Sequence, residues 1–283
     1  MTPKFTTTVT IDDVRAAAKR IEGRIRRTPL LAANLVHDPL PANPTLNLKL
    51  ECLQVSGSFK ARGAMSALTS LDDAAKARGL ITASGGNHGL GVACAGHAAG
   101  VPGTIYLPGN TPPAKADNLR RWGAEVHMYG EVWDDANREA LAVAERDGKT
   151  YIHPFADPSV IAGQGTVSLE VLADAPDTDV LLVSIGGGGL ISGAAMAAKA
   201  LKPEIIVIGI EPVGAPTLHD SVAVGKLVEL AQIDTKANTL APRRSEEINL
   251  ALIQQNVDEI VLVTDAQMYE AARWLWREFG LGV

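Results

Sequence analysis

The chain has 283 residues and a formal net charge of −6, from 26 Lys and Arg against 32 Asp and Glu. This acidic balance argues against a general nucleic-acid binder, which usually presents a basic surface. Hydrophobic residues make up 46% of the chain and charged residues 20%, which argues against a fibrous or wholly disordered protein. At roughly 150 residues per domain, the length allows one large domain or two modest ones.

Two cysteines, Cys52 and Cys94, are too few for a disulfide framework and cannot alone form a zinc site. We expect both to be reduced, small buried side chains in a cytoplasmic protein. No cleavable apolar leader opens the chain, and no stretch of about 18 apolar residues occurs. We therefore expect no membrane span.

The first third of the chain predicts a helix capped at Thr10 or Asp12, a strand over 46–50 and a helix that opens at residues 57–60 and runs to Leu71. Strands and helices then alternate, with residues 212–247 as a helix and loops. The expected strands cover 80–83, 103–107, 125–129, 150–152, 179–185, 205–210 and 258–263. The expected helices cover 92–99, 113–122, 134–146, 190–200 and 266–279. This alternation predicts an α/β fold with parallel sheets that helices cover on both faces.

Three glycine-containing turns are the candidate sites, because ligands of open α/β sheets bind beyond the carboxyl ends of strands. The run Gly186, Gly187, Gly188 and Gly189 lies between a strand and a helix, where backbone N–H groups can cradle a phosphate. It lacks the Lys-Ser/Thr ending of a nucleoside-triphosphate loop, and it fits the dinucleotide G-x-G-x-x-G spacing poorly. A flexible turn is the plain alternative.

The other two turns could hold a carboxylate and a reactive amine. Ser84, Gly85, Gly86, Asn87 and His88 offer backbone donors at a helix start, although His88 alone would more often be a structural histidine. Lys60 follows Ser58 and Phe59 at another helix start, where the helix dipole lowers an amine pKa. A surface lysine is the plain reading of that segment alone. Together, an amine, a phosphate cradle and a carboxylate cradle match the needs of a pyridoxal phosphate enzyme.

The motifs Ser56-Gly-Ser-Phe-Lys60-Ala-Arg-Gly, Ser84-Gly-Gly-Asn-His88, His153-Pro-Phe-Ala-Asp-Pro, Gly163-Gln-Gly-Thr and the tetraglycine run resemble the fold-type-II pyridoxal phosphate enzymes. The chain is most similar to their threonine/serine dehydratase and serine racemase branch, from about Thr28 to Val283. The resemblance implies two open, mostly parallel twisted sheets flanked by helices, as in the tryptophan synthase β-like fold. It also implies a large cofactor-binding domain of residues 1–75 plus 152–283 and a small mobile domain of residues 76–151.

The resemblance also assigns roles to the turn residues. Lys60 would hold pyridoxal 5′-phosphate as a Schiff base and later take the Cα proton, and Phe59 would pack on the ring. Asn87 would contact the 3′ oxygen. The four glycines, Gly186 to Gly189, would bind the phosphate, and Ser84, Gly85, Gly86, Asn87 and His88 would bind the substrate carboxylate.

The implied function is a lyase of amino-acid metabolism. It would be an ammonia-lyase that converts L-threonine or L-serine to a keto acid and ammonia. The alternatives are a serine racemase, a 3-hydroxyaspartate dehydratase and, in a different class, a catalytically silent cofactor binder. Racemases of the family, and some of its dehydratases, carry a second serine where this chain has Gly85. In racemases that serine is the acid/base on the opposite cofactor face, so we expect dehydration and not racemisation. The implied partners are an amino-acid substrate and a second copy in a homodimer.

Three further departures concern the metal, one loop and the chain end. The family's cation site would use Glu211 and Ala215, but Thr217 stands where an Asp is expected, so a divalent cation is not expected. The loop 239–245 carries Arg243 and Arg244, which would suit a second acidic group on the substrate if they line the pocket, or else would be solvated. The chain ends at Val283 where the family continues, so we expect that a C-terminal segment facing the pyridine nitrogen is missing.

Overall fold

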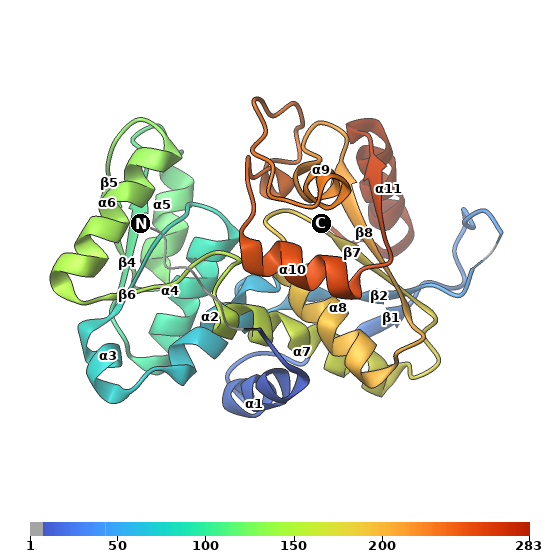
Figure 1. Cartoon of the computed structure of the whole chain (residues 1–283), viewed down its shortest axis with the longest axis horizontal. Coiled ribbons are helices and arrows are strands. Elements are labelled where there is room, and N and C mark those ends of the chain that lie inside the picture. Colours follow the sequence, from blue (N-terminus) through green and yellow to red (C-terminus); the bar gives the residue numbers. More distant parts are fainter. Residues whose placement is uncertain (1–7, 43) are drawn as a thin grey trace.

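The computed structural model describes residues 8–42 and 44–283, and it contains two parallel sheets (Figure 1). The first sheet has the order β5-β4-β3-β6, and the second has the order β7-β8-β9. The strands of the parallel sheets are β3 (Leu80–Ala83), β4 (Gly103–Leu107), β5 (Glu125–Met128), β6 (Thr150–Tyr151), β7 (Val180–Ser184), β8 (Ile206–Pro212) and β9 (Glu259–Val263). Short strands β1 (Leu30–Ala32) and β2 (Asn47–Lys49) pair antiparallel. The expected α/β class with parallel sheets is confirmed.

The helices connect and flank these strands, and most agree with the sequence expectation within two residues. They are α1 (Ile11–Ile21), α2 (Lys60–Ser70), α3 (Asp73–Arg78), α4 (Asn87–Ala99), α5 (Pro113–Arg121), α6 (Trp133–Asp147), α7 (Pro158–Asp174), α8 (Gly189–Leu201), α9 (Thr217–Val224), α10 (Glu247–Asn256) and α11 (Asp265–Phe279), with 3-10 turns η1 (Glu51–Leu53) and η2 (Asn238–Leu240). Thr10 caps α1 in a capping box with Asp13. Helix α4 begins five residues earlier than expected, directly at the end of the glycine turn.

Helix α7, which the sequence pattern did not predict, lies at the centre of the fold. It contacts α1, α2 and α8, and ten of its 17 residues are buried. Glycines bring the backbones together at these crossings: a Cβ on Gly63 would lie 2.9 Å from the Val160 carbonyl oxygen, and one on Gly193 would lie 2.2 Å from the Ile161 carbonyl oxygen. The close packing fixes α2, and with it Lys60, against α7.

The two faces of the β7-β8-β9 sheet are covered unequally. One face packs on α8, α9 and α10 through Val183, Val207 and their neighbours. On the other face, Val180, Leu182 and Ile206 are 43%, 54% and 47% exposed, whereas Ile208 and Ile210 are half-buried. The pattern of a continuously apolar strand is typical of a doubly covered sheet, and the described residues cover the second face only in part.

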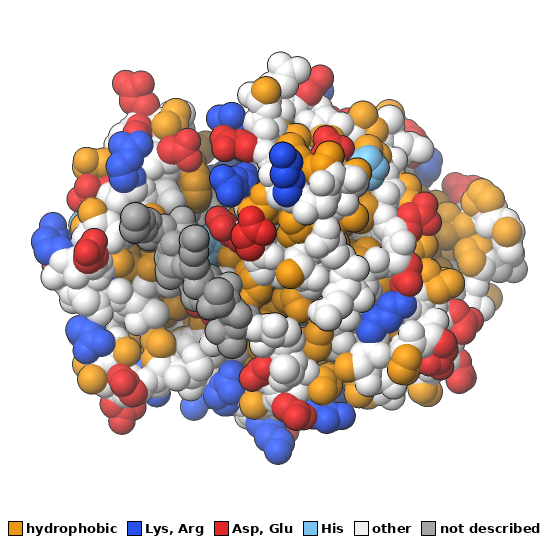
Figure 2. Space-filling view, viewed as in Figure 1, with side chains coloured by type: hydrophobic (Ala, Val, Ile, Leu, Met, Phe, Trp, Pro, Cys, Tyr) orange, Lys and Arg blue, Asp and Glu red, His pale blue; other side chains and the backbone are white. Residues whose placement is uncertain are grey.

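Two expectations from composition can be compared with the structure. Cys94 is buried and Cys52 is partly buried, and both are free. Among the described residues, no helix is both long enough and apolar enough to cross a bilayer. On the face shown in Figure 2, acidic and basic side chains are interspersed, so neither sign of charge dominates that face.

Candidate active site

Lys60 is the first residue of α2, and its amine lies inside the protein. Nζ donates a hydrogen bond to the Pro154 carbonyl oxygen at 2.6 Å and lies 5.2 Å from the centre of the Phe59 ring. Burial lowers the pKa of this amine to about 8. The cause is desolvation rather than the helix dipole that the sequence argument invoked. The amine is therefore partly unprotonated near neutral pH, in the form that attacks carbonyl carbons.

The turn from Ser84 to His88 joins β3 to α4 and leaves backbone N–H groups free. The first hydrogen bond of α4 runs from the Leu90 N–H to the Gly86 carbonyl, so the N–H groups of Asn87, His88 and Gly89 precede it. Gly86 is the N-cap and has no side chain to occupy those donors. The helix start can therefore accept an anion, as the sequence predicted.

The His88 side chain points away from this anion site into the core. Its Nε2 lies 2.9 Å from the Ile152 carbonyl oxygen and 3.1 Å from Thr82 Oγ1. The carbonyl can only accept, so we assign the proton to Nε2. Burial, then the charge of Lys60, lowers the pKa of His88 to about 3. His88 is thus a neutral histidine whose Nε2 is used within the core, and its backbone N–H at the start of α4 is available to a ligand.

The tetraglycine turn joins β7 to α8 and repeats this arrangement. Gly188 is the N-cap with φ +92°, a conformation that L side chains rarely adopt, and the first helical hydrogen bond runs from the Ser192 N–H to the Gly188 carbonyl. A Cβ on Gly187 would lie 2.2 Å from the Phe155 ring, and one on Gly189 would lie 2.6 Å from the Phe155 carbonyl oxygen. Glycine is therefore required sterically, which disfavours the flexible-turn alternative.

Buried polar side chains of α10 and the preceding loop fix the shape of the tetraglycine turn. Ser245 Oγ and Asn249 Nδ2 both donate hydrogen bonds to the Gly187 carbonyl oxygen, at 2.9 and 2.8 Å. These two hydrogen bonds fix the Gly187 carbonyl and do not use the N–H groups at the start of α8, which remain available to a ligand. A preorganised turn of this kind is what a phosphate site requires.

One short segment, residues 152–155, contacts all three candidate turns. The Ile152 carbonyl accepts from His88, the Pro154 carbonyl accepts from Lys60, and the Phe155 ring packs on the tetraglycine turn. Most of this segment belongs to the motif His153-Pro-Phe-Ala-Asp-Pro, for which the sequence predicted no role. Its position directly after a strand, among the other turns, was the available signal.

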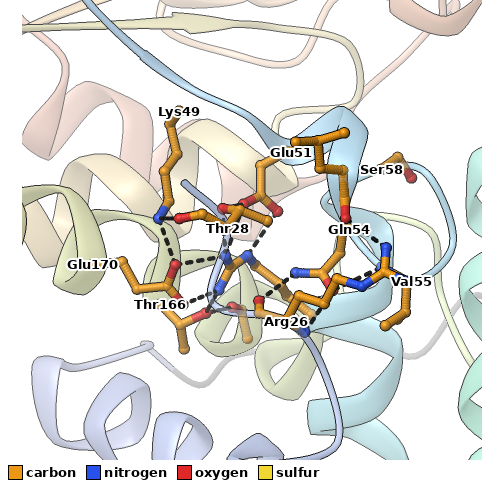
Figure 3. Close-up of polar contacts among 12 residues, drawn as sticks. Arg26, Thr28, Lys49, Glu51, Gln54, Val55, Ser58, Thr166 and Glu170 are labelled. Carbon is orange, nitrogen blue, oxygen red and sulfur yellow. Dashed lines mark hydrogen bonds and ion pairs between the residues drawn. The ribbon is translucent and has the colours of Figure 1, made fainter. Parts of the chain in front are cut away.

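A buried network of charges joins α2 to Lys49, Glu51 and Glu170, which are labelled in Figure 3. Arg62, on the same helix and fully buried, donates to Glu51 Oε1 at 2.7 Å and to Glu170 Oε1 at 2.7 Å, and Lys49 Nζ lies 2.6 Å from Glu170 Oε2. Hydrogen bonds from Arg62 to Thr28 and Thr166 complete its set of partners. Two cations face two carboxylates, so the network is neutral and holds the first turn of α2 to η1 and α7. Sequence reasoning missed this network, because Lys49 and Glu170 are 121 residues apart and no motif joins its members.

These groups fit a cofactor that carries an aldehyde and a phosphate. The buried Lys60 amine suits the aldehyde, and the tetraglycine turn packs too closely on Phe155 for a Cβ on Gly187 or Gly189, while the N–H groups at the start of α8 can face a phosphate. A model of the family described as "Pyridoxal-phosphate dependent enzyme" matches residues 21–283. The chain belongs to this family. Pyridoxal phosphate is therefore the cofactor that the family membership indicates.

Named relatives include lyases and racemases of this family. An L-threonine ammonia-lyase of Thermotoga maritima is 36% identical over 267 residues, covering 94% of this chain and 66% of that protein. A serine racemase of Oryza sativa subsp. indica is 36% identical over 278 residues, covering 96% of this chain and 80% of that protein. The structure of maize serine racemase superposes with a TM-score of 0.92 at 33% identity, covering 98% of this chain and 83% of that one. The chain thus spans slightly less than two thirds of the ammonia-lyase.

The structure also places the residues of the metal and arginine hypotheses. The Glu211 carboxylate accepts hydrogen bonds from the N–H groups of Leu218 and His219 at the start of α9, at 3.0 and 2.7 Å. Ala215 is buried beside it, and the Thr217 hydroxyl donates to the Pro242 carbonyl instead of facing Glu211. Whether a cation binds here stays a prediction.

The loop 239–245 does approach the site, but Arg243 does not point into it. A Cβ on Gly186 would lie 3.1 Å from the Thr239 carbonyl oxygen, so the loop lines the tetraglycine turn. Arg243 instead forms an exposed pair with Glu229 at 3.4 Å and donates to the Leu230 carbonyl. The solvated reading of this arginine is favoured over a substrate contact.

Proposed function

We propose that the chain is a pyridoxal-phosphate-dependent dehydratase that converts a β-hydroxy amino acid such as L-serine or L-threonine to a keto acid and ammonia. The observation that carries the proposal is the Lys60 amine, held at 2.6 Å from the Pro154 carbonyl with a pKa lowered to about 8, between two helix starts that offer free N–H groups. The threonine ammonia-lyase relatives support the same reaction class.

The division of roles follows from the chemistry of each turn. We assign the phosphate to Gly186, Gly187, Gly188 and Gly189, and the substrate carboxylate to the turn of Ser84, Gly85, Gly86, Asn87 and His88, with His88 acting only through its backbone. Both are helix starts, where N–H groups and the helix dipole favour negative charge. The exposed Asn87 side chain and the Phe59 ring beside Lys60 are left to contact the cofactor ring.

When bound, pyridoxal phosphate supplies an electron sink that stabilises negative charge at the substrate Cα. The protein supplies the base and the orientation. Lys60 can take the Cα proton because desolvation leaves its amine partly unprotonated near neutral pH. The N–H groups at the start of α4 hold the carboxylate, which fixes the Cα–H bond relative to Lys60.

Dehydration is favoured over racemisation by Gly85. Racemisation needs a second acid/base group on the face opposite the lysine, and Gly85 has no side chain to supply it. The side chains nearest to a Cβ built there are Leu107, Thr111 and Lys115, at 3.3, 3.4 and 3.9 Å to their closest atoms. All three of these closest atoms are carbons, so none of them is itself an acid or a base.

The test is the release of products by the purified holoenzyme. Incubation with L-serine, L-threonine or 3-hydroxyaspartate should release keto acid and ammonia, with D-serine a minor product from L-serine. The Lys60→Ala variant should lose the yellow absorbance of the bound cofactor at ~410 nm and should lose all activity. D-serine as the main product, or a yellow protein inert to all three substrates, would contradict the proposal.

A second test addresses the phosphate site alone. Gly187→Ala forces a methyl group into the Phe155 ring, so it should weaken cofactor binding. The double variant Gly187→Ala with Phe155→Ala removes the clash and should recover part of the affinity. Titration of the apoprotein with pyridoxal phosphate, followed by absorbance, measures both. Equal affinity in the wild type and Gly187→Ala would remove the turn from the site.

We further propose that residues 76–151 form a small domain that moves against residues 1–75 and 152–283, of which 1–7 and 43 lie outside the described residues. The first sheet with α4, α5 and α6 belongs to 76–151, and the β7-β8-β9 sheet belongs to the remainder. A homodimer in the cytoplasm is the accompanying proposal, based on the family resemblance, and sedimentation of the purified protein tests the dimer.

A further inference from the structure

His153 follows β6 and has one ring nitrogen fixed by the backbone. Nδ1 accepts hydrogen bonds from the N–H groups of Phe155 and Ala156, at 3.3 and 2.9 Å. An N–H donor pair cannot face a protonated nitrogen, so Nδ1 carries no proton. The proton of the neutral ring is therefore on Nε2, which makes Nε2 a hydrogen-bond donor of defined position.

The surroundings of the His153 ring disfavour its protonated, charged form. Burial, and then the positive charge of Lys60, lowers the pKa of His153 to about 4. The Phe155 ring meets the imidazole edge-on at 4.7 Å between centroids, and the Tyr151 ring meets it at 6.3 Å and 66°. These two contacts and the two backbone hydrogen bonds hold the imidazole in one orientation.

The Nε2–H group has no acceptor among the residues that the structure describes. Within the same residues, the polar side-chain atoms that are sealed from solvent and lack a partner are Arg20 Nε, Ser58 Oγ and Gln164 Oε1. Nε2 does not belong to that set, so it faces accessible space. Lys60 Nζ bonds to the next residue, Pro154, and the charge of Lys60 acts on the His153 ring, so the imidazole lies near the reactive amine.

We propose that His153 donates a hydrogen bond from Nε2 to the oxygen on the substrate Cβ as that oxygen leaves. The inference rests on the proposed dehydratase function. We reach it by assigning each hydrogen-bond donor of the site to one acceptor. The N–H groups at the start of α8 bind the phosphate, and those at the start of α4 bind the carboxylate. The Cβ oxygen is the substrate acceptor that remains, and His153 is the unused donor next to Lys60.

The step balances without a further reactant. The Cα–H bond breaks and its proton moves to Lys60 Nζ, and the electron pair left at Cα forms the Cα–Cβ double bond. The Cβ–O bond breaks with its electron pair on oxygen, and this oxygen takes the proton from Lys60 and leaves as water. His153 keeps its own proton and stabilises the negative charge that develops on the oxygen.

The experiment varies the leaving group. β-Chloro-L-alanine loses chloride, which needs neither a proton nor a donor, whereas L-serine loses hydroxide. His153→Asn keeps an oxygen near the Nδ1 position for the Phe155 and Ala156 N–H groups but has no distal donor. His153→Gln places an amide N–H near the Nε2 position. His127→Asn is the matched control, because His127 stacks on Tyr106 away from Lys60.

We expect His153→Asn to lower kcat for L-serine by about 10²-fold, the effect of removing one such donor, and to leave the initial rate with β-chloro-L-alanine unchanged. His153→Gln should recover part of the L-serine rate, and His127→Asn should resemble the wild type. Equal losses with both substrates, or no loss with L-serine, would overturn the inference. A wild type that turns over β-chloro-L-alanine but no β-hydroxy amino acid would instead refute the proposed function, and the inference with it.

A measurement on the apoprotein tests the same geometry without turnover. Nitrogen-15 spectra of the histidine rings should show His153 with Nδ1 unprotonated and Nε2 protonated from pH 6 to 8. A proton on Nδ1 in this range would leave the proposed donor without its hydrogen and would overturn the inference even if the enzyme dehydrates serine.

Discussion

Gly91 of α4 packs directly against Lys60. A Cβ placed on Gly91 would lie 2.9 Å from the Lys60 carbonyl oxygen and 3.2 Å from the Lys60 Cβ. The residue that carries the reactive amine is thus positioned by the absence of a side chain on the neighbouring helix. The two helices α2 and α4 approach so closely here that only glycine fits without movement of the backbone.

Gly91→Ala should therefore displace the start of α2. We expect a loss of about 1–3 kcal/mol in the free energy of unfolding, as for other overpacked sites, and weaker binding of pyridoxal phosphate. Urea denaturation and an absorbance titration measure these. Gly103→Ala is the control, because a Cβ on Gly103 meets no atom within 4 Å. A Gly91→Ala protein with wild-type cofactor affinity would show that this contact does not position Lys60.

The amine of Lys60 should react with acylating reagents at a lower pH than ordinary lysines. Its pKa is lowered to about 8 by burial, so the amine is mostly charged below pH 8 and mostly neutral above it. Acetic anhydride labelling of the folded apoprotein, quantified by mass spectrometry, should have its midpoint near this pH. In urea the midpoint should return to about 10.4. The same midpoint in both states would contradict the desolvation argument.

Removal of Arg62 should destabilise the fold strongly. Arg62→Met leaves Glu51 and Glu170 without their shared partner, and breaking a buried ion pair in this way costs about 3–5 kcal/mol. Arg62→Lys should recover only part of this, because an ammonium cannot bond both carboxylates in a forked geometry. The exposed pair of Arg15 with Asp12 is the control, and Arg15→Met should change stability by less than about 1 kcal/mol.

The loss of stability caused by Arg62→Met should become smaller as the pH is lowered. Burial alone would raise the pKa of Glu170, but the hydrogen bonds and charges of Arg62 and Lys49 hold it below its usual value. A carboxyl with a lowered pKa in the folded state stabilises the fold above its unfolded pKa, and the effect is lost as pH falls through the folded pKa. The stability gap between the wild type and Arg62→Met should therefore narrow in acid. A constant gap would exclude Glu170 as the partner that matters.

Gly85→Ser tests why dehydration is preferred. A Cβ at this position would lie 3.3 Å from Leu107 Cδ2 and 3.4 Å from Thr111 Cγ2, so the side chain fits after small shifts of these two groups. The new hydroxyl would supply an acid/base group opposite Lys60. We expect the variant to form D-serine from L-serine at a higher ratio to pyruvate than the wild type does. Gly85→Ala has the same steric demand without the hydroxyl, and a gain of D-serine in both variants would reject this explanation.

Local patterns predicted every strand except β1, most helices and the three turns, because each depends on residues close together in sequence. The same patterns failed for α7, where Gly163 and Gly165 disfavour a helix locally but permit the close crossings that bury it. They also could not predict that the His88 side chain bonds to Ile152, or that Arg62 pairs with Glu170, because those partners are brought together only by the fold. The exposed side chains of β7 show a second limit of the sequence, because the apolar composition of a strand does not predict which elements cover it.

The segment 152–155 has a mechanical consequence. It is the chain connection between β6 of the first sheet and α7, and it also supplies the carbonyl that holds the Lys60 amine and the ring that backs the tetraglycine turn. A rotation of the first sheet that admits an amino acid would pull on this connection. If residues 76–151 move as proposed, that movement and the release of the Lys60 amine from the Pro154 carbonyl would be one displacement.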